Sequence, residues 1–327
     1  MKNNDRELSI KSVISSMKLS HLQELAKVFE IQVTGKRKND FIEYVSLYIK
    51  NNISIILKNF IIYSEYEFME EICSENYEME IKEDYRDSIK CLEYLGIIYL
   101  DYDCNKEKIF IPTELKANIK QNNFDESTVN CLKKREDLIE LFKDLLDTYG
   151  IIPINVLIDY IIEYIGSEDT VHEALKTLWR YNFRNKVYYN DYKSSYCNIK
   201  IVNMQFLNKK LISNSNLSYK HYNRSQLKSM NGANLNYIEN KIYIILKKYI
   251  TAEFSLKNLE YIKIMIKNDI CTREINEFII QKIKILSGRD RNNIERLINS
   301  LRCYYPLWTL KGHSLKDLTD NSVFKTD

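Results

Sequence analysis

Three consecutive cations, Lys36, Arg37 and Lys38, are the residues best suited to a specific chemistry, the binding of phosphate. They follow Gly35, where the chain can turn, and they precede an Asn-Asp pair that can cap a helix. A link that turns there presents backbone N–H groups and cations together at a helix start, where charge and the helix dipole both stabilise a phosphate. The alternative interpretation is a solvated basic loop, which is common on soluble proteins.

Two amphipathic segments flank these cations. Apolar residues recur at helical spacing over residues 22–29 and again over 41–48, and between them Ile31 and Val33 alternate with polar residues, as in an extended connector. The whole stretch 19–49, LSHLQELAKVFEIQVTGKRKNDFIEYVSLYI, resembles the helix–extended-loop–helix module of the SAP, LEM and Rho N-terminal families. Many members of these families bind nucleic acid, so the resemblance implies that the basic link contacts nucleic acid.

Two further sets of cations are candidates for phosphate contacts. The first lies where a predicted helix ends and a hairpin begins, beside Trp179, which either packs in a core or stacks on a base. The second lies on the last long predicted helix and, with Lys282 and Lys284, either lines a groove or forms the solvated face of a helical bundle. The predicted nucleic-acid-binding residues are Lys36, Arg37, Lys38, Lys176, Arg180, Arg184, Lys186, Arg289, Arg291 and Arg296.

The charge of the chain is unevenly distributed along the sequence. The formal net charge is only +3, yet residues 61–107 carry 4 Lys/Arg against 14 Asp/Glu, and residues 200–313 carry 20 against 8. The helix predicted over Ile81–Leu95 lies in the acidic segment, and a phosphate backbone would repel it. We therefore expect the acidic segment 61–107 to face a protein partner and the basic segments to face a polyanion.

Signatures of catalysis and of cofactor binding are missing from the sequence. It contains no glycine-rich phosphate loop, no HExxH and no CxxC, and its four histidines are far apart. An enzyme would need a pocket assembled from distant residues, so we predict no catalytic residue, no metal and no cofactor. Its seven cysteines are scattered and odd in number, and we find no signal peptide or membrane-spanning run. These features predict a cytoplasmic protein that has reduced thiols and does not associate with membranes.

The fold is predicted to be mainly α with small β-hairpins, because three prolines and seven glycines leave few helix breakers. The order helix, helix, helix, hairpin is typical of a winged-helix fold, and its occurrence twice favours a tandem array of such units. Hairpin strands are predicted at Ile97–Tyr102 with Lys108–Ile111, and at Val187–Tyr189 with Tyr196–Val202; helices at Leu132–Thr148, Ile154–Ile165, Ser167–Tyr181, Tyr237–Tyr249, Leu256–Asn268, Thr272–Leu286 and Asp290–Tyr304. The predicted regions are a SAP/Rho-N-like module (1–52), an acidic winged-helix-like unit (53–118), a second winged-helix-like unit (119–207), a polar linker (208–234) and a basic C-terminal helical domain (235–327).

The chain ends with a distinctive string, PLWTLKGHSLKDL, in which Ser314 can cap a last helical turn. This string resembles a tail of uncharacterised Firmicutes proteins, where it follows a region similar to Tyr149–Ile161, YGIIPINVLIDYI. The resemblance implies shared family membership and no particular chemistry.

Together these observations predict a non-catalytic nucleic-acid-binding protein, with DNA ahead of RNA as the ligand, in a bacterial regulatory, phage or mobile-element setting. The alternative is a protein–protein adaptor or oligomeric scaffold that uses its winged-helix units without nucleic acid. A binder that neutralises several phosphates should lose affinity steeply as salt rises, and an adaptor should not bind nucleic acid at all.

Overall fold

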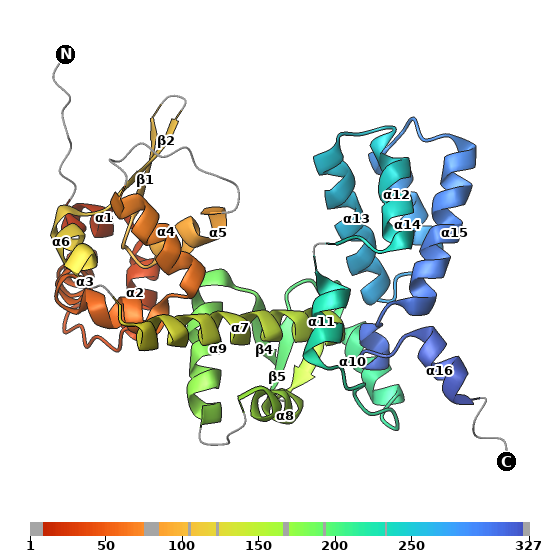
Figure 1. Cartoon of the computed structure of the whole chain (residues 1–327), viewed down its shortest axis with the longest axis horizontal. Coiled ribbons are helices and arrows are strands. Elements are labelled where there is room, and N and C mark those ends of the chain that lie inside the picture. Colours follow the sequence, from red (N-terminus) through yellow and green to blue (C-terminus); the bar gives the residue numbers. More distant parts are fainter. Residues whose placement is uncertain are drawn as a thin grey trace. The chain divides into compact units, whose positions relative to one another are not determined.

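The chain forms two compact units (Figure 1). Unit 1 comprises Met1–Ile139 and Asp169–Asn185, and unit 2 comprises Glu140–Glu168 and Lys186–Asp327, so the backbone crosses between them three times. The computed structural model describes residues 9–74, 85–103, 106–121, 124–165, 170–191, 194–232 and 234–322. Helices dominate both units, and two small antiparallel sheets accompany them, which confirms the predicted fold class.

Unit 1 is a helical assembly with one β-hairpin. Its apolar core is formed mainly by α2, α3 and α4, with residues such as Leu25, Val45 and Ile49 fully buried. Its elements are α1 (Ile10–Ser16), α2 (Leu19–Val28), α3 (Lys38–Phe60), α4 (Tyr63–Ser74), α5 (Arg86–Tyr94), β1 (Tyr99–Asp103), β2 (Lys106–Phe110), α6 (Thr113–Gln121), the first part of α7 (Glu126–Tyr149) and α9 (Val171–Asn185).

The N-terminal segments of unit 1 follow the predicted pattern. Helices α2 and α3 flank a link without regular secondary structure, and the apolar residues at helical spacing form their buried faces. The first hairpin pairs Tyr99 with Phe110 and Asp103 with Lys106, within two residues of the predicted strands. The described part of the helix predicted over Ile81–Leu95 is α5; the preceding residues lie outside the described ranges.

Unit 2 begins with the end of α7 and a three-stranded antiparallel sheet in the order β3-β5-β4. Strands β4 (Tyr188–Asp191) and β5 (Ser195–Asn198) form the predicted second hairpin, and α8 spans Ile154–Ile165 as predicted. Strand β3 (Ile151–Pro153) was not predicted. It has only three residues and leads directly into α8, so its apolar side chains continue the apolar pattern of that helix.

About half of the segment predicted as a polar linker, residues 208–234, is helical instead. It contains the end of α10 (Met204–Ser213) and all of α11 (Arg224–Asn231). Each helix is anchored by one buried leucine, Leu207 or Leu227, and starts at an asparagine whose side chain accepts a backbone N–H. A helix with only one buried leucine has no sustained apolar periodicity in its sequence. For this reason the sequence pattern predicts a linker here.

Four helices of unit 2 form an antiparallel bundle, in which each helix reverses the direction of the one before (Figure 1). They are α12 (Tyr237–Lys247), α13 (Ala252–Lys267), α14 (Thr272–Lys282) and α15 (Gly288–Tyr304). Isoleucines and leucines from all four helices fill the bundle core. The 3-10 turn η3 (Trp308–Leu310) and α16 (Leu315–Ser322) complete the unit, and Ser314 caps α16 as predicted by accepting the Asp317 N–H at 3.2 Å.

The elements of the second predicted winged-helix unit, 119–207, are shared between the two compact units. Helix α9 belongs to unit 1, whereas α8 and the β4–β5 hairpin belong to unit 2. This division gives the winged-helix interpretation of that region no support.

Candidate functional site

The basic link at residues 36–38 is exposed, but the start of α3 next to it is already occupied by a carboxylate. The Arg37 N–H donates to Asp40 Oδ2 at 2.9 Å, and a Cβ added at Gly35 would lie 1.9 Å from the same oxygen. Lys38 Nζ donates to the Ser15 carbonyl at 2.8 Å. A phosphate at this helix start would compete with the Asp40 carboxylate. The link can therefore contact a polyanion only through the side-chain charges of Lys36 and Arg37.

Arg184 is buried in unit 1, so its side chain cannot reach a nucleic acid as the sequence predicted. Its side chain is 2% exposed and pairs with Glu65, which is 1% exposed, at 2.9 Å. Burial opposes the charge on Arg184, but the Glu65 carboxylate outweighs it and keeps the pKa of the guanidinium above its ordinary value. Nearby, burial and the same carboxylate raise the pKa of the Cys91 thiol to about 12, so this cysteine is not a nucleophile.

The other cations near α9 do not form one surface within either unit. Arg180 lies over the Phe60 ring at 4.6 Å and donates to the Asn59 carbonyl at 3.4 Å, so its guanidinium is engaged inside unit 1. Lys176 is half-buried in unit 1, and Lys186 is exposed but belongs to unit 2. Trp179 packs against Phe183 and remains 39% exposed.

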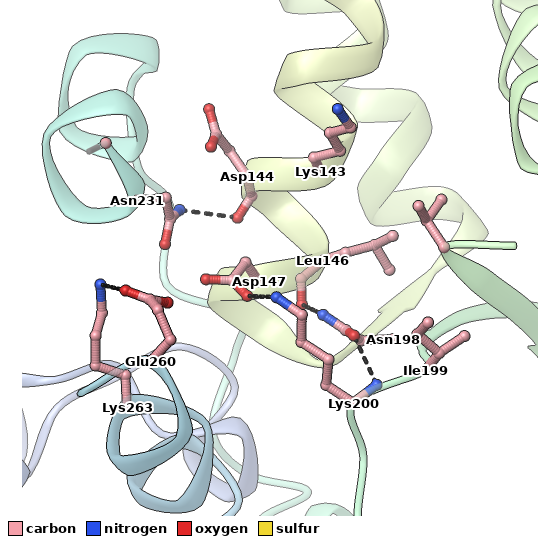
Figure 2. A pocket seen from close by; sticks show the side chains of 12 residues that line it. Lys143, Asp144, Leu146, Asp147, Asn198, Ile199, Lys200, Asn231, Glu260 and Lys263 are labelled. Carbon is pink, nitrogen blue, oxygen red and sulfur yellow. Dashed lines mark hydrogen bonds and ion pairs between the residues drawn. The ribbon is translucent and has the colours of Figure 1, made fainter. Parts of the chain in front are cut away.

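Unit 2 contains a cavity of about 550 Å³ (Figure 2). Charged and amide side chains from α7, α11, α13 and the end of β5 line it. The polar lining residues are Lys143, Asp144, Asp147, Asn198, Lys200, Asn231, Glu260 and Lys263.

The ionic groups around this cavity are paired with one another. Asp147 accepts from the buried Lys267 and, at 3.4 Å, from Lys200. Lys263 lies between Glu260 at 2.9 Å and Glu239 at 3.3 Å. A second set of contacts joins α11 to α7 beside the cavity. Arg224 binds the Asp144 carboxylate at 2.6 Å, and Asn231 donates to the Asp144 carbonyl at 3.1 Å.

This pairing indicates a structural role for the cavity wall. Burial opposes the charge on Asp147, but Lys267 and Lys200 outweigh it and hold the pKa of Asp147 below the usual range, so this carboxylate is ionised at neutral pH. The network joins α7, α11 and α13 and leaves no excess of one charge to attract a ligand. Among the described residues, no group of three or more His, Cys, Asp or Glu side chains is arranged to hold a metal ion.

Replacing Asp147 with asparagine should lower the free energy of unfolding of unit 2 by about 2–3 kcal/mol at pH 7, because Lys267 would be left buried without a carboxylate. Since the folded pKa of Asp147 is depressed, its contribution is present above the ordinary value of about 3.9 and is lost as pH falls through the folded pKa. Urea unfolding at pH 7 and near pH 3 measures both effects. An equal difference between variant and wild type at the two pH values would contradict the assignment. The control, Glu163→Gln, changes an exposed contact of 2.8 Å between the Glu163 carboxylate and His221 Nε2, and it should change stability by under ~0.5 kcal/mol.

A group of exposed cations lies at one end of the α12–α15 bundle. The α12–α13 and α14–α15 connections meet there, because Lys248 Nζ donates to Asp290 at 3.3 Å and the Tyr249 hydroxyl donates to Asp290 at 2.8 Å (Figure 1). The Ser287 N–H also donates to the Tyr249 hydroxyl at 3.3 Å. We call residues 247–254 and 282–291 the basic cap; its cations are Lys247, Lys248, Lys282, Lys284, Arg289 and Arg291, and its acids are Glu253 and Asp290.

The basic cap contains two of the ten predicted site residues, Arg289 and Arg291, and Arg296 is exposed further along the same helix. Sequence reasoning missed Lys247 and Lys248, which lie about 40 residues before the other cations. An antiparallel bundle brings alternate connections to the same end. The four consecutive predicted helices would therefore have indicated that Lys247 and Lys248 lie at the same end as the cations of residues 282–291.

No family model, no curated protein and no solved structure matches this chain. No helix in the described ranges has the length and the apolar character needed to cross a membrane.

Proposed function

We propose that this protein is a non-catalytic nucleic-acid-binding protein and that the basic cap of unit 2 contacts phosphates, with DNA as the first ligand to test. The observation that carries the proposal is the meeting of two basic connections at one end of the bundle. Six exposed Lys and Arg side chains gather there against two acids, a net charge of +4. Lys36 and Arg37 in unit 1 are the second set of exposed cations that we assign to phosphate contacts.

The chemistry of the cap suits a polyanion better than a small anion. The cations are exposed and spread over two connections, so each can reach a different phosphate and release its counterions. Asp290 is already engaged by Lys248 and Tyr249, so this ion pair adds no net charge and the other five cations face only Glu253.

Neutralising the cap should weaken binding and reduce its salt dependence. We expect the variant Lys282→Gln/Lys284→Gln/Arg289→Gln/Arg291→Gln to bind duplex DNA at least ~10-fold more weakly at ~50 mM salt. The slope of log affinity against log salt should become shallower by about 0.9 for each phosphate that the variant no longer neutralises. Fluorescence anisotropy of the full chain with a labelled random-sequence duplex, between ~50 and ~200 mM salt, measures both quantities.

The matched control removes the same charge elsewhere. Lys18, Lys27, Lys50 and Lys90 are exposed on helices or helix starts of unit 1, and changing all four to glutamine should leave most of the affinity. Equal losses of affinity in the two variants would show that only net charge matters and would contradict a site at the basic cap.

The second candidate, a protein–protein adaptor or scaffold, is favoured by exposed apolar side chains near α10. Ile199, Val202 and Ile212 are 56%, 67% and 63% exposed. If the wild-type chain binds neither DNA nor RNA at ~50 mM salt, the adaptor is the function that these surfaces support.

A further inference from the structure

Two large apolar side chains of the basic cap are exposed to solvent. Phe254 is 56% exposed and Ile285 is 73% exposed. Neither contributes to the apolar core of the bundle, which is complete without them. An exposed aromatic ring in a basic segment is an arrangement that single-stranded nucleic acid can use, because every base has a face on which a ring can stack.

The backbone on each side of these two residues is fixed. Phe254 lies in the first turn of α13, where its N–H donates to the capping hydroxyl of Thr251 at 3.4 Å. Ile285 lies between Ile283 and Leu286, which are 3% and 7% exposed and anchor the connection in the core. The exposure of Phe254 and Ile285 is therefore imposed by the fold, and a ligand that covers them meets side chains whose backbone is already in place.

We propose that the basic cap binds single-stranded nucleic acid, with its cations on the phosphates, the Phe254 ring stacked on a base and Ile285 packed against a neighbouring nucleotide. This inference rests on the proposed function and names the class of ligand. A duplex keeps its base faces stacked inside, where Phe254 does not reach them. The cap is also built from helix ends and connections, whereas duplex readers place the side of a helix or a β-ribbon in the major groove.

The test compares single-stranded and duplex DNA of the same length, about 20 nucleotides, bound to the full chain. We expect the single strand to bind more tightly at equal salt. The Phe254→Ala variant should weaken single-strand binding by about 5- to 100-fold and change duplex binding little, because only the single strand offers a base to stack. Phe254→Trp should retain or strengthen the binding, because it keeps an aromatic face at this position.

A matched control is available on the same helix. Leu256 is 44% exposed and lies two residues after Phe254 on α13, and Leu256→Ala removes apolar surface there without removing a ring. This variant should bind single strands as the wild type does. If Leu256→Ala and Phe254→Ala weaken binding equally, stacking is not involved and the inference is overturned.

The remaining outcomes separate this inference from the proposed function. If the four-cation variant loses DNA binding but Phe254→Ala does not weaken single-strand binding, the proposed function stands and the single-strand inference fails. If neither single-stranded nor duplex DNA binds, both the proposed function and the single-strand inference fail.

Cations around Phe254 and Ile285 also suit an anionic lipid surface. The lipid test uses vesicles of phosphatidylserine and phosphatidylcholine. If these vesicles bind the wild type but not the Phe254→Ala/Ile285→Ala variant, and if the two proteins bind DNA equally, the inference is overturned in favour of a membrane contact.

Discussion

Replacing Glu65 with alanine is expected to lower the free energy of unfolding of unit 1 by about 3–5 kcal/mol, because the guanidinium of Arg184 would stay buried without a counter-charge. The Glu65 carboxylate accepts from Arg184 at 2.9 Å and from the Ile62 N–H at 3.1 Å, so the substitution leaves both donors without this acceptor. Urea unfolding combined with hydrogen exchange of peptides from α4 and α9 measures the change in this unit.

Two further variants test the cause of this loss. Glu43→Ala breaks an exposed pair with Lys11, whose side chains are 68% and 66% exposed, and should change stability by under ~1 kcal/mol. The double variant Glu65→Leu/Arg184→Met removes both charges, and it should recover much of the stability that Glu65→Ala loses. A loss below ~1 kcal/mol for Glu65→Ala itself would contradict the buried pair.

Replacing Trp308 with alanine should lower the free energy of unfolding of unit 2 by about 3–5 kcal/mol, because it leaves a large cavity in a packed cluster. Trp308 is fully buried with Ile151, Cys197 and Leu207, and its Nε1–H donates to the Asp147 carbonyl at 3.0 Å. We expect Trp308→Phe to lose less, since it keeps an aromatic ring but not the donor. Urea unfolding with hydrogen exchange of peptides from α10 measures both.

The fluorescence of the chain provides an independent check on Trp308. The sequence has two tryptophans, so the variant Trp179→Phe leaves Trp308 as the only reporter. Its emission should be blue-shifted in the native state and should move to longer wavelength on unfolding. The stability control is Tyr304→Ala, which removes a ring that is 59% exposed and should cost under ~1 kcal/mol. Native emission at the wavelength of a solvent-exposed indole would contradict the burial of Trp308.

Two strings of the sequence that are far apart along the chain meet in the core of unit 2. A Cβ added at Gly150, whose φ is +70°, would lie 2.5 Å from the Trp308 ring, and one added at Gly312 would lie 2.4 Å from Tyr149. The Tyr222 hydroxyl also donates to the Gly312 carbonyl at 2.7 Å. The strings YGIIPINVLIDYI and PLWTLKGHSLKDL therefore pack directly against each other within unit 2.

Local pattern was enough to predict most of the helices and both hairpins. Apolar residues at helical spacing marked the buried faces of α2, α3 and α12–α15, and alternation marked the strand pairs around Asp103–Glu107 and Asp191–Ser195. These features depend on residues a few positions apart, so the sequence carries them directly. Short elements with one buried anchor, such as α11, have too little pattern to be seen in this way.

The state of each charge was decided only by the tertiary structure. Arg184 lies just after the end of one predicted helix and Arg291 near the start of another, yet Arg184 is buried beside Glu65 and Arg291 is exposed in the basic cap. The partner of Arg184 lies 119 residues away, and Lys248 meets Asp290 across 42 residues. Helical spacing determines which side of a helix each residue occupies. Which sides face each other, and therefore which charges are paired and which reach solvent, follows from the packing of whole helices.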